Sequence, residues 1–479
     1  MIFFLRDRPR SYNLTVAPVA LLVLALAFLL GRHASPTWLA LIAGGIGGVV
    51  LLARPALGLF ALVLAALVVP LEFGTGTEVR LNPVTLLVPA VAALWLLDRV
   101  RRRELRFVPS PVNRPLLLFL GANLLSLLVG RATWDPLVPV KDNFLLVQLA
   151  QWAIFAFAAL AFWLTANLAT DEGVLRRLTQ AFLLVGGGVA VLRALPGLGG
   201  LTPHFTTAAF VRAPFWVLLA ALAGGQLLWN RRLALGWRLF LGAALLATLA
   251  YAFAEQREAA SNWVGIAAVL GTLVWLRFPR LRWPLVALVL ILALIGILFP
   301  AVYQFAGGDY EWRLSGGSRL VLIERVVEVT LRNPLTGLGP AAYRPYANMK
   351  PLPYRGAYWV APLVNSHNNY VDLFAHGGIV GLALFAWFAA EVARLGLRLR
   401  RRYRDGFAAG YVNGMLAAGA GSLVIMALAD WILPFVYNIG FHGFQAGVLV
   451  WLFLGGLVAL GRGGEGEGER GREEERVRG

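Results

Sequence analysis

The chain has 479 residues, of which 59% are hydrophobic and 14% charged, and its formal net charge is +18. Apolar runs near the roughly 20 residues that a helix needs to cross a bilayer recur along it, which predicts a polytopic membrane protein. Because cysteine is absent, disulfides, a thiolate nucleophile and Cys-ligated metals are excluded. The basic residues stand mostly in short loops between the apolar runs, which favours a role in membrane orientation over nucleic-acid binding.

The sequence predicts an all-α fold with about 12–14 transmembrane helices. Arg6, Arg8 and Arg10 precede the first apolar run, but no clear cleavage site follows that run, so we expect a retained first helix. The apolar runs give these expected spans: Leu14–Gly31, Trp38–Ala53, Ala56–Pro70, Pro83–Leu97, Pro115–Gly130, Phe144–Asn167, Leu178–Leu195, Ala213–Trp229, Trp237–Ala254, Ala259–Leu276, Trp283–Tyr303, His367–Ala393, Phe407–Ala429 and Phe441–Leu460.

The loop charges predict the orientation of these spans. A cytoplasmic N-terminus puts the arginine-rich loops, such as 99–106 and 394–404, on one side, as the positive-inside rule requires. Both termini are therefore expected in the cytoplasm. Four parts follow along the chain: N-terminal transmembrane helices (1–303), one large outer loop (304–366), C-terminal transmembrane helices (367–460) and a Gly-, Glu- and Arg-rich tail (461–479) that is expected to be disordered.

The outer loop is expected to contain an amphipathic helix. Apolar residues recur with helical spacing from Leu320 to Thr330, Asn333-Pro334 is expected to end that helix, and residues 337–340 are expected to form a turn. Such a helix is expected on the outer leaflet. The loop also holds aromatic residues that either stack on sugar rings or belong to an interfacial belt, namely Tyr343, Tyr346, Tyr354, Tyr358 and Trp359.

A polar cluster opens the span that follows the outer loop. Residues 365–372 read Asn-Ser-His-Asn-Asn-Tyr-Val-Asp, and Asn365 or Ser366 is expected to cap the helix. His367 would then lie at the membrane boundary, where an imidazole, whose ordinary pKa is ~6.5, is suited to accept a proton. Asp372 would lie one turn inside the membrane. An ionisable group there is costly enough to be a functional candidate.

This cluster resembles the signature of the O-antigen ligase and polymerase family, bacterial membrane glycosyltransferases in which a His-Asn pair opens a helix that soon reads Gly-x-x-Gly-Leu. Here the glycine pattern begins at Gly378, and the position before the glycine pair Gly377-Gly378, which is usually acidic in the family, is His376. Arg212 and Arg257 resemble outer-loop arginines of the family. The outer loop also resembles the family pattern, at Arg319, Pro334, Gly337, Gly339 and Tyr343, with Ser318 in place of a glycine.

The resemblance implies a metal-independent, inverting glycosyltransferase of the bacterial inner membrane that uses no cofactor. Its donor would be a glycan linked to polyprenyl pyrophosphate, and its acceptor a hydroxyl of a glycan or lipid. His367 would be the general base. Arg212, Arg319 and Arg257 would bind the pyrophosphate, and Asn368, Asp372 and Tyr343 would support the site.

Several alternatives stay open at this stage. The protein could join lipid-linked repeat units as a polymerase, move lipid-linked glycans as a transporter, or act as a scaffold of a cell-envelope complex. Arg257 could instead pair with Glu255 or Glu258, and Asp372 could either orient the surroundings of His367 or pack against Arg257. The sequence contains no Asp-x-Asp, Walker or Gly-x-Ser-x-Gly motif, which argues against nucleotide-driven chemistry.

Overall fold

The computed structural model of the chain describes residues 45, 47–74, 80–104, 107–256, 260–298, 317–354, 357–359 and 364–462. The chain divides into two compact units, Met1–Pro55 and Ala56–Gly479, and all elements named below belong to the second. The first expected span, 14–31, and residues 463–479 of the expected tail lie outside the described residues. Both expectations stay predictions.

Helices dominate the second unit, which confirms the predicted all-α fold. In the described part of the chain, strands occur as two short antiparallel pairs, β1 with β2 and β3 with β4. The elements are, in chain order, α3 (Leu57–Val68), β1 (Phe73–Gly74), β2 (Arg80–Leu81), α4 (Pro83–Arg101), α5 (Asn113–Ala132), α6 (Phe144–Leu168), α7 (Glu172–Phe182), η1 (Leu183–Gly187), α8 (Gly188–Ala194), η2 (Gly199–His204), η3 (Ala208–Val211), α9 (Ala213–Trp229), α10 (Leu235–Ala250), η4 (Tyr251–Glu255), α11 (Ala260–Arg277), η5 (Pro279–Leu281), α12 (Arg282–Leu298), α15 (Gly317–Thr330), α16 (Tyr343–Ala347), β3 (Leu352–Tyr354), β4 (Ala357–Trp359), α17 (Asn369–Arg402), α18 (Gly406–Met426) and α19 (Gly440–Arg462).

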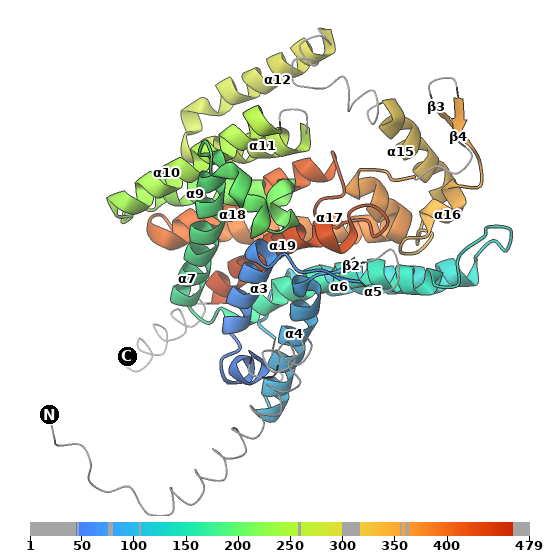
Figure 1. The fold of residues 1–479 in the computed structure, drawn as a ribbon, viewed down its shortest axis with the longest axis horizontal. Helices are drawn as coiled ribbons and strands as arrows, with labels where there is room; N and C mark the ends of the chain where they lie inside the picture. Colours follow the sequence, from blue (N-terminus) through green and yellow to red (C-terminus); the bar gives the residue numbers. More distant parts are fainter. Residues whose placement is uncertain are drawn as a thin grey trace, which may run out of the picture. The chain divides into compact units, whose positions relative to one another are not determined.

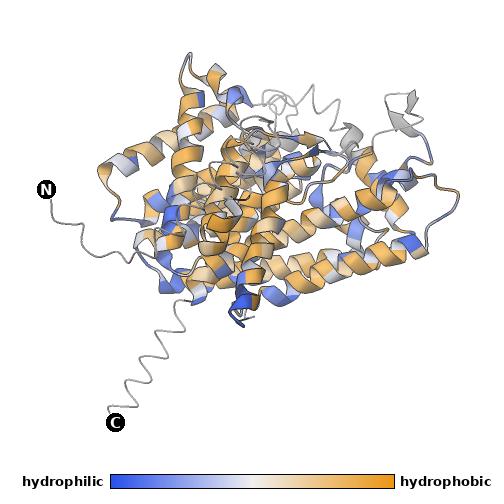
Figure 2. Cartoon of the chain, turned by 60° about the horizontal axis from the view of Figure 1, so that its bottom comes forward, coloured by the Kyte–Doolittle hydropathy of each residue, from blue (hydrophilic) through white to orange (hydrophobic). Residues whose placement is uncertain are grey.

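Among the described residues, 8 helical stretches are long and apolar enough to cross a membrane, which confirms a polytopic membrane protein. Hydrophobic residues predominate along these helices, as Figure 2 shows. Each stretch falls on one expected span, and α3, α9, α11 and α12 fall on four further ones. The eight are Pro83–Arg101, Asn113–Ala132, Phe144–Leu168, Glu172–Ala194, Leu235–Glu255, Asn369–Arg402, Gly406–Met426 and Gly440–Arg462.

The helices that follow residue 366 pack between those that precede residue 304 (Figure 1). The closest pairs are α9 with α18 and α6 with α19, and α17 packs along α5. Small residues allow the first pair to approach: a Cβ on Gly225 would lie 2.3 Å from the carbonyl oxygen of Gly410. Gln226 of α9 also donates to the carbonyl of Phe407 at the start of α18, at 3.1 Å. The two sets of helices therefore share one core.

The expected loop helix forms as α15 but ends at Thr330, three residues before Asn333. Val326, Val329 and Thr330 are buried, and α15 packs against α16 and α17. This packing covers part of the apolar face of α15, and the expected position of this helix on the outer leaflet stays a prediction.

Helix α17 is interrupted at Gly378, whose φ of 64° and ψ of −166° are not helical. The loop after α15 fills the interruption. Its Leu338 N–H donates to the carbonyl of Ala375 at 2.9 Å, and its Pro334 carbonyl accepts the N–H of Ile379 at 2.9 Å. Backbone groups freed by a break in an apolar helix need such partners. The interruption thus fixes the segment that follows α15 against the first part of α17.

Replacing Gly378 by alanine is expected to destabilise the protein. The backbone region is accessible to glycine alone, which costs about 1–3 kcal/mol for another residue, and the new Cβ would lie 2.1 Å from the carbonyl oxygen of Leu335. The effect is measured as the unfolding temperature of the purified protein, with size-exclusion chromatography to detect the loss of folded protein after heating. Gly242→Ala is the control, because its Cβ would meet nothing within 4 Å. Equal unfolding temperatures of the two variants would contradict this account.

Candidate functional site

His367 lies in a tight backbone turn directly before α17. Its φ of 49° is in the left-handed region, which histidine adopts more readily than most residues. The hydroxyl of Ser366 accepts the backbone N–H of Asn368 at 3.0 Å and closes this turn. The side chain of Asn368 accepts two N–H groups of the first helical turn, at 2.9 and 3.2 Å. Asn368 is therefore the cap, and the expectation that Asn365 or Ser366 caps the helix was wrong, because the Ser366 hydroxyl is used in the turn.

Asp372 anchors the turn from the first turn of α17. Its Oδ1 accepts the hydroxyl of Ser366 at 2.7 Å and that of Tyr343 at 2.9 Å. The side chain is 3% exposed, and within the described residues its Oδ2 has no hydrogen-bond partner. A carboxylate buried at this depth is costly, which is typical of functional sites in membrane proteins. This geometry fits the alternative in which Asp372 orients the surroundings of His367.

Tyr343 lies in the protein interior. Its side chain is fully buried, and its ring stacks on Phe435 and His376 with centroids 4.6 and 5.6 Å apart. Burial raises the pKa of Tyr343 well above its ordinary value, and the carboxylate of Asp372 acts in the same direction. Tyr343 therefore neither faces a sugar ring nor belongs to an interfacial belt. His376, 1% exposed, is part of the same aromatic stack.

Arg344 is a site residue that the sequence analysis missed. Its Nε donates to the carbonyl of Val364 at 3.0 Å, and its guanidinium also donates to the side chain of Asn365. The same guanidinium lies 4.6 Å over the ring of Tyr437. Burial lowers the pKa of Arg344, and neighbouring groups that include the Asp372 carboxylate oppose this shift. Arg344 thus fixes the residues that lead into the His367 turn, and its one sequence signal is its position next to Tyr343.

The connection between α18 and α19, residues 427–439, covers the start of α17. Asn368 donates to the carbonyl of Ala427 at 3.0 Å, and Asn369 accepts the N–H of Ile432 at 3.1 Å. Asp430 in this connection is 2% exposed and accepts the N–H of Phe435 at 2.9 Å. The sequence analysis missed Asp430, although an acidic residue between two apolar runs was a usable signal.

Arg212 lies at the N-cap of α9 and faces this connection. Its guanidinium is 5.3 Å from the ring centroid of Trp431, and among the described residues its buried Nε has no hydrogen-bond partner. Burial lowers the pKa of Arg212, while the charge of Asp430 opposes that shift. The structure therefore brings Arg212 to the same connection that holds Asn368, with guanidinium N–H capacity left for an anion.

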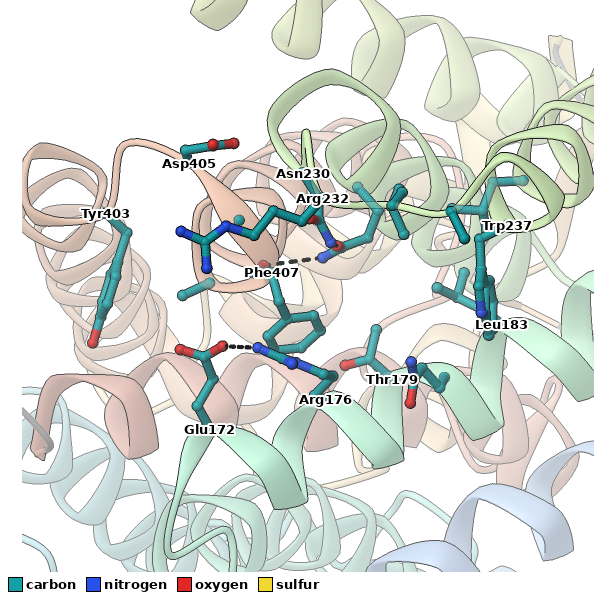
Figure 3. A pocket seen from close by; sticks show the side chains of 17 residues that line it. Glu172, Arg176, Thr179, Leu183, Asn230, Arg232, Trp237, Tyr403, Asp405 and Phe407 are labelled. Atoms are coloured by element: carbon teal, nitrogen blue, oxygen red, sulfur yellow. Dashed lines mark hydrogen bonds and ion pairs between the residues drawn. The ribbon is translucent and has the colours of Figure 1, made fainter.

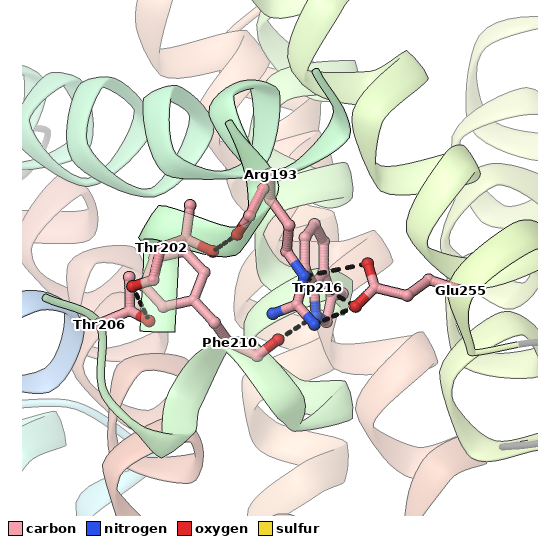
Figure 4. Close-up of polar contacts among 7 residues, drawn as sticks. Arg193, Thr202, Thr206, Phe210, Trp216 and Glu255 are labelled. Atoms are coloured by element: carbon pink, nitrogen blue, oxygen red, sulfur yellow. Dashed lines mark hydrogen bonds and ion pairs between the residues drawn. The ribbon is translucent and has the colours of Figure 1, made fainter. Parts of the chain in front are cut away.

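A second arginine near Arg212 is already paired. Arg193 donates through Nε to both carboxylate oxygens of Glu255, at 2.9 and 3.0 Å, and its guanidinium lies 5.1 Å over Tyr251. Figure 4 shows this pair beside Trp216, whose indole N–H donates to the carbonyl of Phe210. Glu255 thus pairs with Arg193. Glu255 is the last residue of η4, a π-helical turn that the sequence pattern does not predict, and this turn positions its carboxylate.

The remaining predicted site residues are less fully described. Arg319 is the third residue of α15, and the description does not extend to its side chain. Arg257 and Glu258 lie outside the described residues. Within the described ranges, no three His, Cys, Asp or Glu side chains are grouped so that they could hold a metal ion.

Part of the chain matches a known protein family. Residues 258–386 match the family model described as O-antigen ligase. The matched segment contains Arg319, Tyr343, His367, Asn368 and Asp372, which confirms the resemblance that the sequence predicted. It supports a membrane glycosyltransferase-like function in O-antigen biosynthesis. The comparison with curated proteins gave no match.

Proposed function

We propose that this protein is an inverting, metal-independent glycosyltransferase of the O-antigen ligase type. It would move a glycan from a polyprenyl-pyrophosphate carrier to a hydroxyl acceptor at the outer face of the bacterial inner membrane. The match of residues 258–386 supports the reaction class. The observation that carries the proposal is the turn held by Ser366 and Asp372, which presents His367 at the start of α17.

In this proposal His367 is the general base. Its side chain is partly exposed, while its backbone is fixed on both sides by buried polar groups. As the acceptor oxygen attacks the anomeric carbon, the imidazole takes the hydroxyl proton and the bond from that carbon to the pyrophosphate oxygen breaks. Direct displacement of this kind inverts the anomeric configuration. The pyrophosphate leaves with the carrier lipid.

The pyrophosphate requires positive charge, and arginine supplies it without a metal. Arg212 has unused donor capacity beside Trp431, and Arg319 and Arg257 are proposed as further ligands. A guanidinium fork matches two phosphate oxygens at once. Positive groups already in place at a leaving group need no reorganisation during the reaction.

Asn368, Asp372 and Tyr343 are proposed as positioning residues. Asn368 caps α17 and donates to Ala427, so it joins the His367 turn to the connection that also contacts Arg212. The carboxylate of Asp372 accepts from Tyr343 and Ser366. These contacts would hold the proposed base, His367, at a fixed distance from Tyr343 in the loop before α17.

The proposal keeps the predicted division of the chain. Residues 304–366 would face the outer side together with His367, the helices of 1–303 and 367–460 would embed the site in the membrane, and both termini, with the tail 461–479, would be cytoplasmic. The charge distribution of the short loops supports this orientation.

A transfer assay tests the function. The purified full-length chain is incubated with a short glycan on polyprenyl pyrophosphate and a panel of glycan and lipid acceptors, and products are sized by mass spectrometry. Transfer to an acceptor, undiminished by EDTA, is expected. Strong inhibition by EDTA would contradict the metal-independent mechanism, and a lack of product with every acceptor would favour a transporter.

The same assay separates a ligase from a polymerase. With the lipid-linked glycan alone, a ligase leaves the donor unextended, whereas a polymerase yields a ladder spaced by one repeat unit. We expect the unextended donor, in keeping with the family that residues 258–386 match. A ladder would instead assign the acceptor site to a second lipid-linked glycan.

A further inference from the structure

A polar cavity of about 440 Å³ lies between the end of α5 and the segment that follows α15. The proposed transfer reaction assigns no role to the residues around it. They come from two parts of the chain, and those that bear on its chemistry are Gly130 and Asp135 on one side and Arg332, Asn333, Leu338 and Tyr346 on the other. The cavity thus joins the connection between α5 and α6 to the expected outer loop.

The two walls of the cavity are in direct contact. A Cβ on Gly130 would lie 2.1 Å from the carbonyl oxygen of Leu338, so the backbones meet there. The backbone N–H of Asp135 donates to the hydroxyl of Tyr346 at 3.1 Å, and the guanidinium of Arg332 lies 5.2 Å from the centroid of the same ring. Tyr346 is 7% exposed, so it builds the wall and leaves little ring surface on which a sugar could stack. The cavity is therefore formed without a ligand.

The charges of the lining cancel. Arg332 donates to Oδ2 of Asp135 at 3.0 Å, and the backbone N–H of Leu137 donates to Oδ1 of the same carboxylate at 3.0 Å. The bond from Leu137 and that from Arg332 hold the pKa of Asp135 below its ordinary value, so the carboxylate stays charged at neutral pH. One paired cation and one paired anion line the cavity, which gives it no net charge to attract an ion.

The lining nevertheless keeps polar groups for a ligand. The side chains of Arg332 and Asp135 are 56% and 32% exposed, and a guanidinium has more N–H groups than the bond to Asp135 uses. Asn333 accepts the hydroxyl of Thr336 at 3.0 Å, and among the described residues its amide nitrogen donates to no acceptor. A sugar hydroxyl both donates and accepts, so it fits N–H donors beside a carboxylate. A neutral polar cavity of this kind suits an uncharged sugar.

The cavity is connected to the start of α17. Leu338, which lines it, donates its N–H to the carbonyl of Ala375 at 2.9 Å. Since α17 begins at Asn369, Ala375 lies about 9 Å along the helix axis from that start at the rise of an α-helix. A glycan several sugars long can therefore extend from the cavity toward the His367 turn.

A second polar cavity, of about 430 Å³, lacks this connection (Figure 3). It is lined by residues of α7, α9, α10 and α18 and of the loops between them, and none of its lining residues belongs to 304–366. Its charges also cancel, because Arg176 donates to Glu172 at 2.5 Å and the charge of Arg232 acts on Asp405. Position, and not polarity alone, thus distinguishes the cavity beside α5.

We propose that the cavity beside α5 binds uncharged sugar units of a glycan, with Arg332, Asp135 and Asn333 as ligands of the sugar hydroxyls. This inference rests on the proposed transfer function and adds a subsite that holds the glycan away from the anomeric carbon. The glycan of the donor and that of the acceptor share this chemistry, and the transfer assay distinguishes them.

Binding of lipid-free glycans tests the proposal without any transfer. The purified full-length chain is titrated in detergent with a panel of short bacterial oligosaccharides, neutral and acidic, and the heat of binding is measured. Neutral members are expected to bind. Arg332→Gln is expected to weaken that binding about tenfold, the effect of losing a hydrogen bond from a charged group. Asn333→Asp keeps the acceptor for Thr336 but loses the amide donor, so it should also weaken binding.

Arg80→Gln is the matched control. Arg80 is exposed, forms an ion pair with Glu72 and does not line the cavity, so its loss removes the same charge without the same contacts. Equal effects of Arg80→Gln and Arg332→Gln would overturn the proposal, as would a lack of binding by every neutral oligosaccharide or tighter binding of acidic ones. A lower unfolding temperature of Arg332→Gln with unchanged glycan affinity would do the same, because Arg332 would then only join the two walls.

The transfer assay identifies which glycan occupies the cavity. A KM that rises in Arg332→Gln for the lipid-linked donor assigns the cavity to the donor glycan, and one that rises for the acceptor assigns it to the acceptor glycan. The outcomes also separate this inference from the proposed function. Glycan binding that depends on Arg332 in a chain without transfer activity would keep the subsite and reject the transferase, whereas transfer with unchanged KM values in Arg332→Gln would reject the subsite alone.

Discussion

Replacing His367 by alanine is expected to reduce glycan transfer by about 10²- to 10⁴-fold, the usual contribution of a general base. The acceptor hydroxyl would then have to attack without a group to take its proton. Substrate binding should change little, because the turn is closed by the side chain of Ser366 and the backbone of Asn368. The measurement is the rate of transfer at saturating donor, with the unfolding temperature of each variant as a check on folding.

His204→Ala provides the matched control, since His204 is exposed and lies at the end of η2, outside the His367 turn. It should transfer glycan at the rate of the unchanged protein. Added imidazole should restore part of the activity of His367→Ala, a rescue that a purely structural histidine would not show. A folded His367→Ala variant that works as fast as the unchanged protein would rule out His367 as the base.

The positions of the helices could be predicted from the sequence because each follows from one apolar run. The expected span at 407–429, for example, is found as α18 at Gly406–Met426. The interruption of α17 could not be predicted, although the Gly377-Gly378 pair was visible. It depends on Pro334 and Leu338, some forty residues earlier, whose backbone groups bond on either side of the break.

The sequence analysis predicted the site residues that lie within one short segment and missed those that come from distant parts of the chain. His367, Asn368 and Asp372 stand within one short segment, so the motif indicated them together. Arg344 and Asp430 reach the same place from α16 and from the connection between α18 and α19, and only the tertiary packing brings them there. The same reason explains Tyr343, whose aromatic character suggested a surface role while its hydroxyl donates to a buried carboxylate.

Replacing Arg212 by glutamine is expected to lower kcat/KM for the lipid-linked donor by about 10²- to 10³-fold, as for the loss of one preorganised donor at a developing charge. The binding of polyprenyl pyrophosphate itself should weaken as well, which a competition assay measures without any transfer. Arg212→Lys keeps the charge but loses the planar fork, so its kcat/KM should fall between that of the unchanged protein and that of Arg212→Gln. The Nε of Arg212, which has no hydrogen-bond partner among the described residues and lies beside Trp431, is the structural basis of this expectation.

The alternative is that Arg212 only stabilises the connection between α18 and α19 through its contact with Trp431, which is worth about 0.5–2 kcal/mol. In that case Arg212→Gln would lower the unfolding temperature and leave the affinity for polyprenyl pyrophosphate unchanged. Arg80→Gln controls for the loss of one charge, because Arg80 is exposed and pairs with Glu72. If the affinity for polyprenyl pyrophosphate falls in Arg212→Gln and is unchanged in Arg80→Gln, Arg212 binds the pyrophosphate. A contact with Trp431 alone would affect the stability of the protein and not this affinity.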